Sequence, residues 1–146
     1  MAPENKLKEM IKYIVGQYDE PRVLTRTKLI KLLYLSDKFA EEERGSKISD
    51  TDYVMYQYGP YSEEITDTLE DMDGEAISEV IGRSPSGKYY QYVPRHANVS
   101  GELSEREKEI IDRVLRGYGD FDTEELVDEV YTMYNLDNNK KYTRVL

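Results

Sequence analysis

The chain of 146 residues contains no cysteine, only one histidine and only two phenylalanines. Without cysteine it can form neither a disulfide nor a thiolate metal site, and this composition is typical of a reducing compartment. No apolar run approaches the roughly 20 residues that a membrane-spanning helix needs. The first residues also lack the apolar region of a signal peptide. We therefore expect a cytoplasmic protein that does not contact the membrane.

The residue types that carry most enzyme chemistry are also scarce. The single histidine, His96, lies in a polar connector, and neither a Gly-x-Ser-x-Gly motif nor a glycine-rich phosphate loop is present. Carboxylates are plentiful, but a calcium loop built around Gly74 would place Leu69 and Val80 where acidic ligands are needed. The sequence therefore predicts no catalytic residue, no metal site and no cofactor, and we expect a protein that is not an enzyme.

The formal net charge of −10 is distributed unevenly along the chain. Residues 39–79 carry 13 acids and 2 bases, whereas residues 80–101 carry three bases and no acid. Residues 1–38 are also basic overall. The chain as a whole would be repelled by nucleic acid, but these two basic segments would not.

Apolar residues at helical spacing, together with capping residues, predict five helices. They span about residues 4–18, 27–43, 62–72, 104–116 and 123–134. The second helix is rich in leucine and apolar on too many faces for a surface helix, so we expect it at the centre of the core. Either Thr25 or Thr27 should cap it, and two capping boxes, Ser104–Glu107 and Asp122–Glu125, should start the last two helices.

Strand signals are confined to the middle of the chain. The aromatic segment 53–58 predicts one short strand, which the Gly59-Pro60 pair should end. The segments 76–82 and 88–93 flank a Pro/Gly turn and predict a β-hairpin.

The order of these elements predicts an α+β fold. We expect a mainly helical single domain, with about five helices around the central leucine-rich helix, one short strand and a β-hairpin, in winged-helix-like order. Its core should cover about residues 4–134, followed by a tail over 135–146 that is polar apart from Tyr142 and Val145.

The aromatic residues are dominated by tyrosine, with fourteen tyrosines against two phenylalanines. Such side chains are enriched where proteins contact each other, because the ring packs while the hydroxyl finds a partner. We expect Tyr61, at a helix start beside the Gly-Pro pair, to be an exposed anchor. Tyr34 and Tyr131 should instead pack in the core.

Two motifs carry a family resemblance. The first is Lys28-Leu-Ile-Lys-Leu-Leu-Tyr34 in the central helix, and the second is Gln57-Tyr58-Gly59-Pro60-Tyr61. They resemble the Lys-Leu-x-Lys-Leu-Leu-Tyr helix and the aromatic-Gly-Pro turn of the Panacea domain in SocA-like antitoxins. Segments 103–119 and 123–126 are similar in style to the closing helices of that family. The resemblance implies one Panacea-like domain over residues 1–146, and a non-enzymatic protein that neutralises a cognate toxin by direct protein–protein contact.

We expect the partner protein to bind at the Gly-Pro turn and at the helix start that follows it. The candidate partner-binding residues are Tyr56, Tyr58, Gly59, Pro60, Tyr61, Glu63 and Glu64. The turn would supply a buried anchor, and the acids would meet a basic surface of the partner and speed association.

A winged-helix-like, DNA-binding transcriptional regulator is the alternative function. Its candidate contacts lie on and just after the hairpin: Arg83, Lys88, Tyr90 and Arg95. Helix 62–72, which would enter the major groove, carries five acids and no base, so recognition through it is disfavoured. A weaker contact through the hairpin and further bases stays open, the other interpretation being that these bases balance the acidic middle segment. The further bases are Arg22, Arg26, Lys28 and Lys31.

Overall fold

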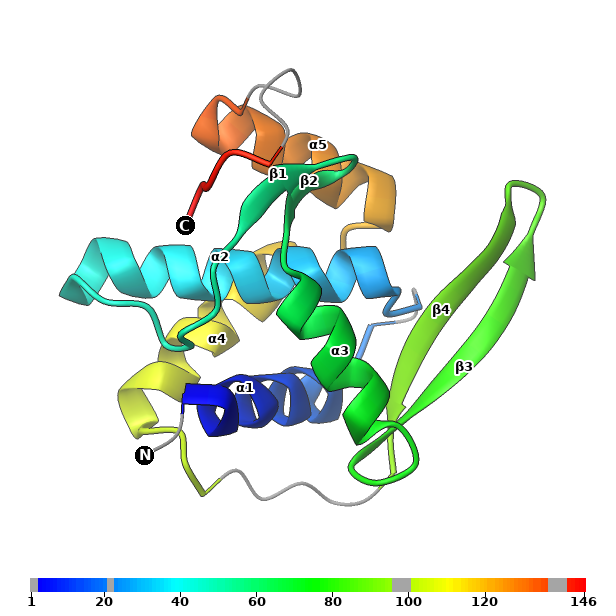
Figure 1. Cartoon of the computed structure of the whole chain (residues 1–146), viewed down its shortest axis with the longest axis horizontal. Helices are drawn as coiled ribbons and strands as arrows, with labels where there is room; N and C mark the ends of the chain where they lie inside the picture. The colour runs from blue at the N-terminus through cyan, green and yellow to red at the C-terminus, as the bar shows by residue number, and fades with distance from the viewer. Residues whose placement is uncertain (1–2, 21–22, 96–100, 137–141) are drawn as a thin grey trace.

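Five helices and two small antiparallel sheets make up the described part of the protein. The computed structural model describes residues 3–20, 23–95, 101–136 and 142–146. Along these ranges the order is α1 (Pro3–Gln17), α2 (Arg26–Arg44), β1 (Val54–Tyr56), β2 (Gly59–Tyr61), α3 (Glu63–Met72), β3 (Ile77–Ser84), β4 (Gly87–Pro94), α4 (Glu105–Tyr118) and α5 (Thr123–Tyr134). The α+β, mainly helical single domain predicted from the sequence is confirmed (Figure 1).

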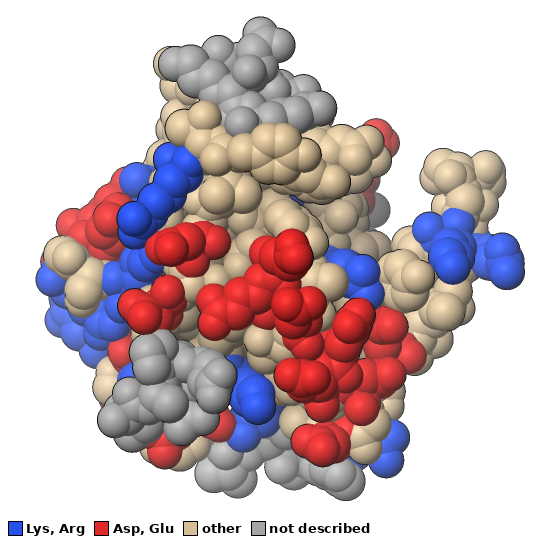
Figure 2. Space-filling model, viewed as in Figure 1, with Lys and Arg blue, Asp and Glu red and all other residues tan. Residues whose placement is uncertain are grey.

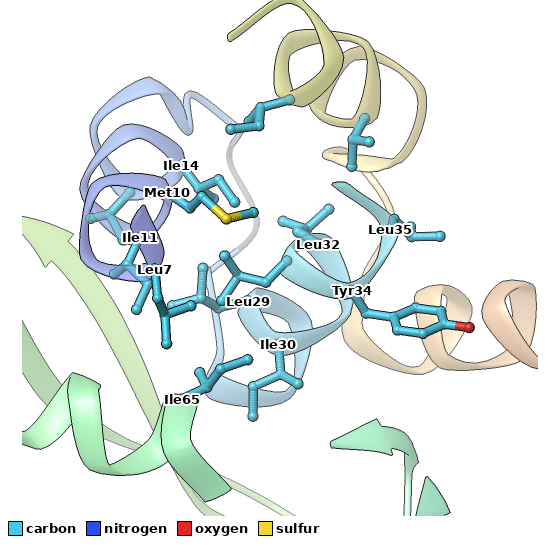
Figure 3. Close-up of a cluster of buried hydrophobic side chains, with 14 of the residues drawn as sticks. Leu7, Met10, Ile11, Ile14, Leu29, Ile30, Leu32, Tyr34, Leu35 and Ile65 are labelled. Atoms are coloured by element: carbon cyan, nitrogen blue, oxygen red, sulfur yellow. The ribbon is translucent and has the colours of Figure 1, made fainter. Parts of the chain in front are cut away.

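Helix α2 lies at the centre of the core, as its leucine-rich sequence predicts. Every residue from Lys28 to Asp37 is buried, and α1, α4 and α5 surround the helix (Figure 1). Figure 3 shows Leu29 and Leu32 pointing toward α1, where Met10 meets them. Burial of this large apolar surface is the main favourable term in the folding of the domain.

Local capping explains where the helices begin and end. Thr25, one of the two threonines expected to cap α2, accepts a hydrogen bond from the amide of Lys28 at 3.2 Å. Ser104 and Asp122 begin α4 and α5 with the reciprocal capping boxes that the sequence predicts. Gly45 ends α2 in the left-handed conformation, with φ of 83°.

The Gly59-Pro60 pair is part of a strand, so the prediction that it ends one is wrong. β1 turns back through a two-residue loop into β2, with Tyr56 opposite Gly59 and Met55 opposite Pro60. Gly59 permits this reversal because its φ of 95° is readily adopted only by glycine. The result is a second hairpin where the sequence predicts a single strand.

Pro60 fits inside β2 because its missing N–H has no strand partner to lose. The N–H and C=O of one residue in an antiparallel pair point to the same side of the strand. Met55 bonds on the side away from β2, since its amide donates to Thr143 (2.9 Å) and its carbonyl accepts from Tyr142 (2.6 Å). Pro60, opposite Met55, therefore directs its carbonyl away from β1, where Lys31 of α2 donates to it at 3.0 Å.

The end of the chain lies against β1. The sequence predicts a polar tail over residues 135–146, but within it the described residues 142–146 pair with the strand. The amide of Val145 donates to the carbonyl of Tyr53 at 2.8 Å, and Leu146 is buried. These residues cover a strand edge that would otherwise be open to other chains.

The hairpin of β3 and β4, which we call the arm, projects from the helical body (Figure 1). It confirms the predicted β-hairpin and closes with Ser84 opposite Gly87. Tyr89 lies over Gly82, where an added side-chain carbon would come within 2.3 Å of the tyrosine ring. The ring of Tyr89, in β4, thus covers the space left on β3 by the missing side chain of Gly82.

Three charged side chains of α2 are buried, and each bonds to a different part of the chain. The ammonium of Lys28 donates to the carbonyl of Gly119 (2.7 Å), to the carbonyl of Phe121 and to the hydroxyl of Tyr18 (2.7 Å). It therefore holds the turn between α4 and α5 against α2. Lys31 holds β2 in the same manner, through Pro60.

Asp37 holds the segment between α2 and β1. Its carboxylate accepts hydrogen bonds from the amides of Ile48 and Ser49 (both 2.9 Å), the hydroxyl of Ser49 (2.6 Å) and the hydroxyl of Tyr53 (2.9 Å). Burial raises the pKa of Asp37, although these four bonds favour the charged form. Removal of this side chain would leave four buried donors without their acceptor.

We expect the substitution Asp37→Ala to lower the free energy of unfolding by about 3 kcal/mol, because buried donors without acceptors are strongly destabilising. Urea unfolding followed by circular dichroism measures this change. The control is Asp50→Ala at an exposed site nearby, which we expect to change stability by about 0.5 kcal/mol or less. Equal effects of the two substitutions would contradict the role assigned to Asp37.

Candidate partner-binding site

The β1–β2 hairpin and the start of α3 bring together every residue that the sequence assigns to partner binding. In chain order these are Tyr56, Tyr58, Gly59, Pro60, Tyr61, Glu63 and Glu64. The strands, the turn and the helix that carry them are continuous in sequence. Their spatial proximity therefore follows directly from the local fold.

The tyrosines of this hairpin differ in exposure. Tyr58, in the turn, is 55% exposed, and Tyr56 is 37% exposed. Tyr61, the expected exposed anchor, is only half-exposed, because its ring packs against the core and its hydroxyl lies 3.0 Å from that of Thr66. Tyr58 is thus the aromatic side chain that the hairpin presents most openly.

A fourth tyrosine joins this group from the end of the chain. The ring of Tyr56 lies 5.0 Å from that of Tyr61 and 5.8 Å from that of Tyr142, measured between centroids. Tyr142 is 71% exposed and was not among the predicted site residues. Its only sequence signal is that it is aromatic within a polar tail. We call Tyr56, Tyr58, Tyr61 and Tyr142 the tyrosine cluster.

Other tyrosines serve packing. Tyr34 is buried, as predicted, and its ring lies 5.3 Å from that of Tyr53 and 5.9 Å from that of Tyr134. Tyr131 of α5 is half-buried and forms a hydrogen bond with the backbone of Gly59. This contact connects α5 to the β1–β2 hairpin and helps to fix the hairpin in place.

Two hollows flank the tyrosine cluster. A narrow cleft of about 90 Å³ lies between the hairpin and α2, and its lining includes Tyr58 and Lys31. A more open hollow of about 340 Å³ includes Glu63 and Tyr142 in its lining. Tyr56 and Tyr61 line both. The surface around the cluster is therefore indented on both sides rather than flat.

Lys31 is the most deeply buried polar group of the cleft, with only 2% of its surface exposed. Burial lowers its pKa from 10.5 to about 7, because the charged ammonium is disfavoured away from water. The hairpin approaches it closely at Gly59, where an added side-chain carbon would lie 3.3 Å from Cε of Lys31. Glycine at this position thus meets both a conformational and a steric requirement.

Helix α3 presents one acidic and one apolar side. Its buried residues include Ile65, Leu69 and Met72. Its five acids are all exposed, and Figure 2 shows acidic residues gathered over this part of the surface. We call them the acidic face: Glu63, Glu64, Asp67, Glu70 and Asp71. The candidate site thus combines exposed aromatic rings with an adjoining negative surface.

The residues of the alternative, DNA-binding interpretation lie mainly on the arm. Arg83 and Lys88 are exposed and opposite each other near its tip, where Figure 2 shows basic side chains apart from the acidic face. Tyr90 is half-buried, and Arg95 is exposed just after β4. Arg22 lies outside the described residues.

Two further bases of that interpretation are inaccessible. Lys28 and Lys31 are buried, so a nucleic-acid contact through them is ruled out. Backbone carbonyls are among the acceptors of both ammonium groups. Arg26, by contrast, pairs with Glu79 at 2.9 Å, as charge balance predicts.

Within the described ranges, no group of three or more His, Cys, Asp or Glu side chains is arranged to hold a metal ion. None of the helices in these ranges combines the length and the apolar character needed to cross a bilayer. His96 lies outside the described residues.

Comparison with known families confirms the resemblance seen in the motifs. The family described as "Antitoxin SocA-like, Panacea domain" matches residues 29–133. This range runs from α2 into α5 and contains the β1–β2 hairpin, α3 and the arm. Among curated proteins, none matches the sequence.

We expect Lys31 to make stability depend on pH, and the substitution Lys31→Met to remove that dependence. Because the pKa of Lys31 is lowered to about 7 by folding, the unfolded chain binds more protons between about pH 7 and 10.5, and stability rises with pH there. From pH 7 to pH 9, the unfolding free energy of the wild type should therefore rise by about 2–3 kcal/mol relative to that of the methionine variant. Urea unfolding at several pH values measures this difference, and parallel stability curves for the two proteins would contradict it.

Proposed function

Because the chain belongs to the family of SocA-like antitoxins with a Panacea domain, we propose that it is a non-enzymatic antitoxin that binds and neutralises a toxin protein in the cytoplasm. The family match supports this function, since it covers most of the domain. Neutralisation by direct contact requires a surface that holds another protein firmly. The tyrosine cluster and the acidic face are the parts of the surface best suited to that task.

The observation that carries this proposal is the exposed tyrosine cluster beside the acidic face. Tyrosine rings bury a large apolar area while their hydroxyls remain able to hydrogen-bond, which is why they recur as anchors of interfaces. The hairpin is also held in place before binding, by Lys31 from α2 and by residues 142–146. A surface that is already ordered loses less conformational entropy when a partner binds.

The acidic face would act on a basic surface of the toxin. Its five acids are exposed and adjoin the hairpin through Glu63, which lines the hollow beside Tyr61. Complementary charges of this kind mainly accelerate encounter and fix orientation. The tyrosine cluster would then supply the contacts that keep the complex together.

The DNA-binding alternative has less support. The exposed basic pair on the arm favours it, but two of the bases assigned to it are buried and α3 is acidic on its exposed side. The formal net charge of −10 would also repel phosphates from the molecule as a whole. The double substitution Arg83→Ala with Lys88→Ala therefore serves as a control for the antitoxin proposal.

We expect Tyr58→Ala to weaken toxin binding at least about tenfold, because it truncates the most exposed ring of the hairpin. The test expresses the products of the genes adjacent to the coding sequence, identifies one that arrests growth, and restores growth by co-expression of this protein. Tyr58→Ala should lose the rescue while its thermal midpoint stays within about 2 °C of the wild type. The arm double variant should retain the rescue. If the arm variant lost the rescue and Tyr58→Ala kept it, the assignment of the interface would be contradicted.

We expect the double substitution Glu63→Gln with Glu64→Gln to slow association with the toxin by about three- to tenfold at low salt, with little change in dissociation. The difference should vanish at about 0.5 M salt, where charges are screened within a few ångströms. Surface plasmon resonance measures both rates. The matched control is Glu41→Gln with Glu42→Gln, an exposed acidic pair near the C-terminal end of α2. If the control slows association equally, the effect comes from the net charge of the protein, and the role assigned to the acidic face is contradicted.

A further inference from the structure

Two buried lysines lie one helical turn apart on α2, and their surroundings differ. Lys28 has three acceptors within hydrogen-bond distance, from Tyr18, Gly119 and Phe121, which match its three N–H donors. Lys31 has one acceptor among the described residues, the carbonyl of Pro60 at 3.0 Å. Its ammonium therefore has donors left over, although only 2% of the residue is exposed.

Lys31 is one of the residues that line the cleft between α2 and the β1–β2 hairpin, so a group that enters the cleft would come close to its side chain. The described lining of this cleft includes two basic side chains and no acidic one. The second base, Arg26, is already engaged, since it donates to Glu79 and to the hydroxyl of Tyr92, both at 2.9 Å. Lys31 is thus the one cation of the cleft that the described residues do not pair with a carboxylate.

We propose that this cleft receives an aspartate or glutamate side chain of the toxin, and that its carboxylate pairs with the ammonium of Lys31. This inference rests on the proposed antitoxin function and adds the chemistry of one toxin residue to it. A carboxylate would satisfy the donors that Pro60 leaves unpaired. It would also favour the charged form of a lysine whose pKa is lowered by burial.

The size and lining of the cleft fit this occupant. A volume of about 90 Å³ admits a carboxylate and its neighbouring methylene, which together displace about two waters of roughly 30 Å³ each. The tyrosine rings that line the cleft would shield the ion pair from water, and such shielding strengthens a charge pair. A carboxylate bound there would also fix the position of the toxin relative to Tyr58, an exposed residue of the lining.

The first test uses short capped peptides as probes and the full chain labelled with ¹⁵N. The acidic probe is acetyl-Gly-Asp-Gly-amide, and its neutral match is acetyl-Gly-Asn-Gly-amide. We expect the acidic peptide to shift the amide signals of Tyr58, Gly59 and Tyr61 saturably, with a Kd on the order of 1–10 mM, and the neutral peptide to bind at least about tenfold more weakly. Lys31→Met should abolish the shifts, whereas Lys88→Met on the arm should leave them unchanged.

Signals elsewhere in the Lys31→Met spectrum report whether the variant keeps its fold. Equal shifts from the neutral peptide, shifts that persist in a folded Lys31→Met variant, or no saturable shift in the wild type would each overturn the inference. Acetate that binds as tightly as the acidic peptide would overturn the assignment of the carboxylate to a protein side chain.

The second test uses the toxin complex and separates this inference from the antitoxin proposal. Lys31→Met should weaken the complex at least about tenfold, and one Asp→Asn or Glu→Gln substitution in the toxin should have no further effect in that background, as a double-mutant cycle shows. Intact growth rescue and affinity in Lys31→Met would overturn the cleft inference alone. Saturable binding of the acidic peptide without any rescued toxin would count against the antitoxin function instead.

Discussion

The structure depends on the buried polar groups of α2, which connect the central helix to parts of the chain far away in sequence. Lys28 bonds to the turn between α4 and α5, Lys31 to β2, and Asp37 to the segment before β1. Buried charges are tolerated only where hydrogen bonds replace the water they lose. The same bonds explain how a helix with charged residues in its motif can lie at the centre of a core. The apolar residues of α2 bring the surrounding elements together, and the polar ones determine where each connection lies.

The elements that could be predicted from the sequence are those set by local interactions. Five helices, two capping boxes and the arm follow from periodicity, from cap residues at Ser104 and Asp122, and from a turn of two residues. The β1–β2 hairpin could not be predicted in the same way. Proline is compatible with β2 because its carbonyl faces α2 and its missing N–H faces no strand partner, which depends on contacts with Met55 and Lys31. The burial of the two lysines likewise depends on acceptors located about thirty to ninety residues further along the chain.

The candidate site was predictable to the extent that its residues are contiguous. Tyr56 to Glu64 come from one hairpin and the helix that follows it, so a correct motif was enough to place them together. The exposure of Tyr61 was not predictable, because it depends on packing against the core and on Thr66. Tyr142 joins the cluster only because residues 142–146 pair with β1. A pairing between segments nearly ninety residues apart leaves no local signal in either of them.

The two kinds of charge near the tyrosine cluster would act at different stages of binding. The acids of α3 are exposed, so their field reaches an approaching partner over about one Debye length, roughly 8 Å at physiological ionic strength. Lys31 is buried beneath the hairpin and contributes little to that external field, but its interaction with an inserted carboxylate would take place in a poorly hydrated cleft. The acidic face would therefore influence how fast a basic partner arrives, and Lys31 how long a correctly shaped one remains. A partner with only a basic surface would be attracted without being retained, whereas one that also carries an acidic residue at the matching position would be both attracted and held.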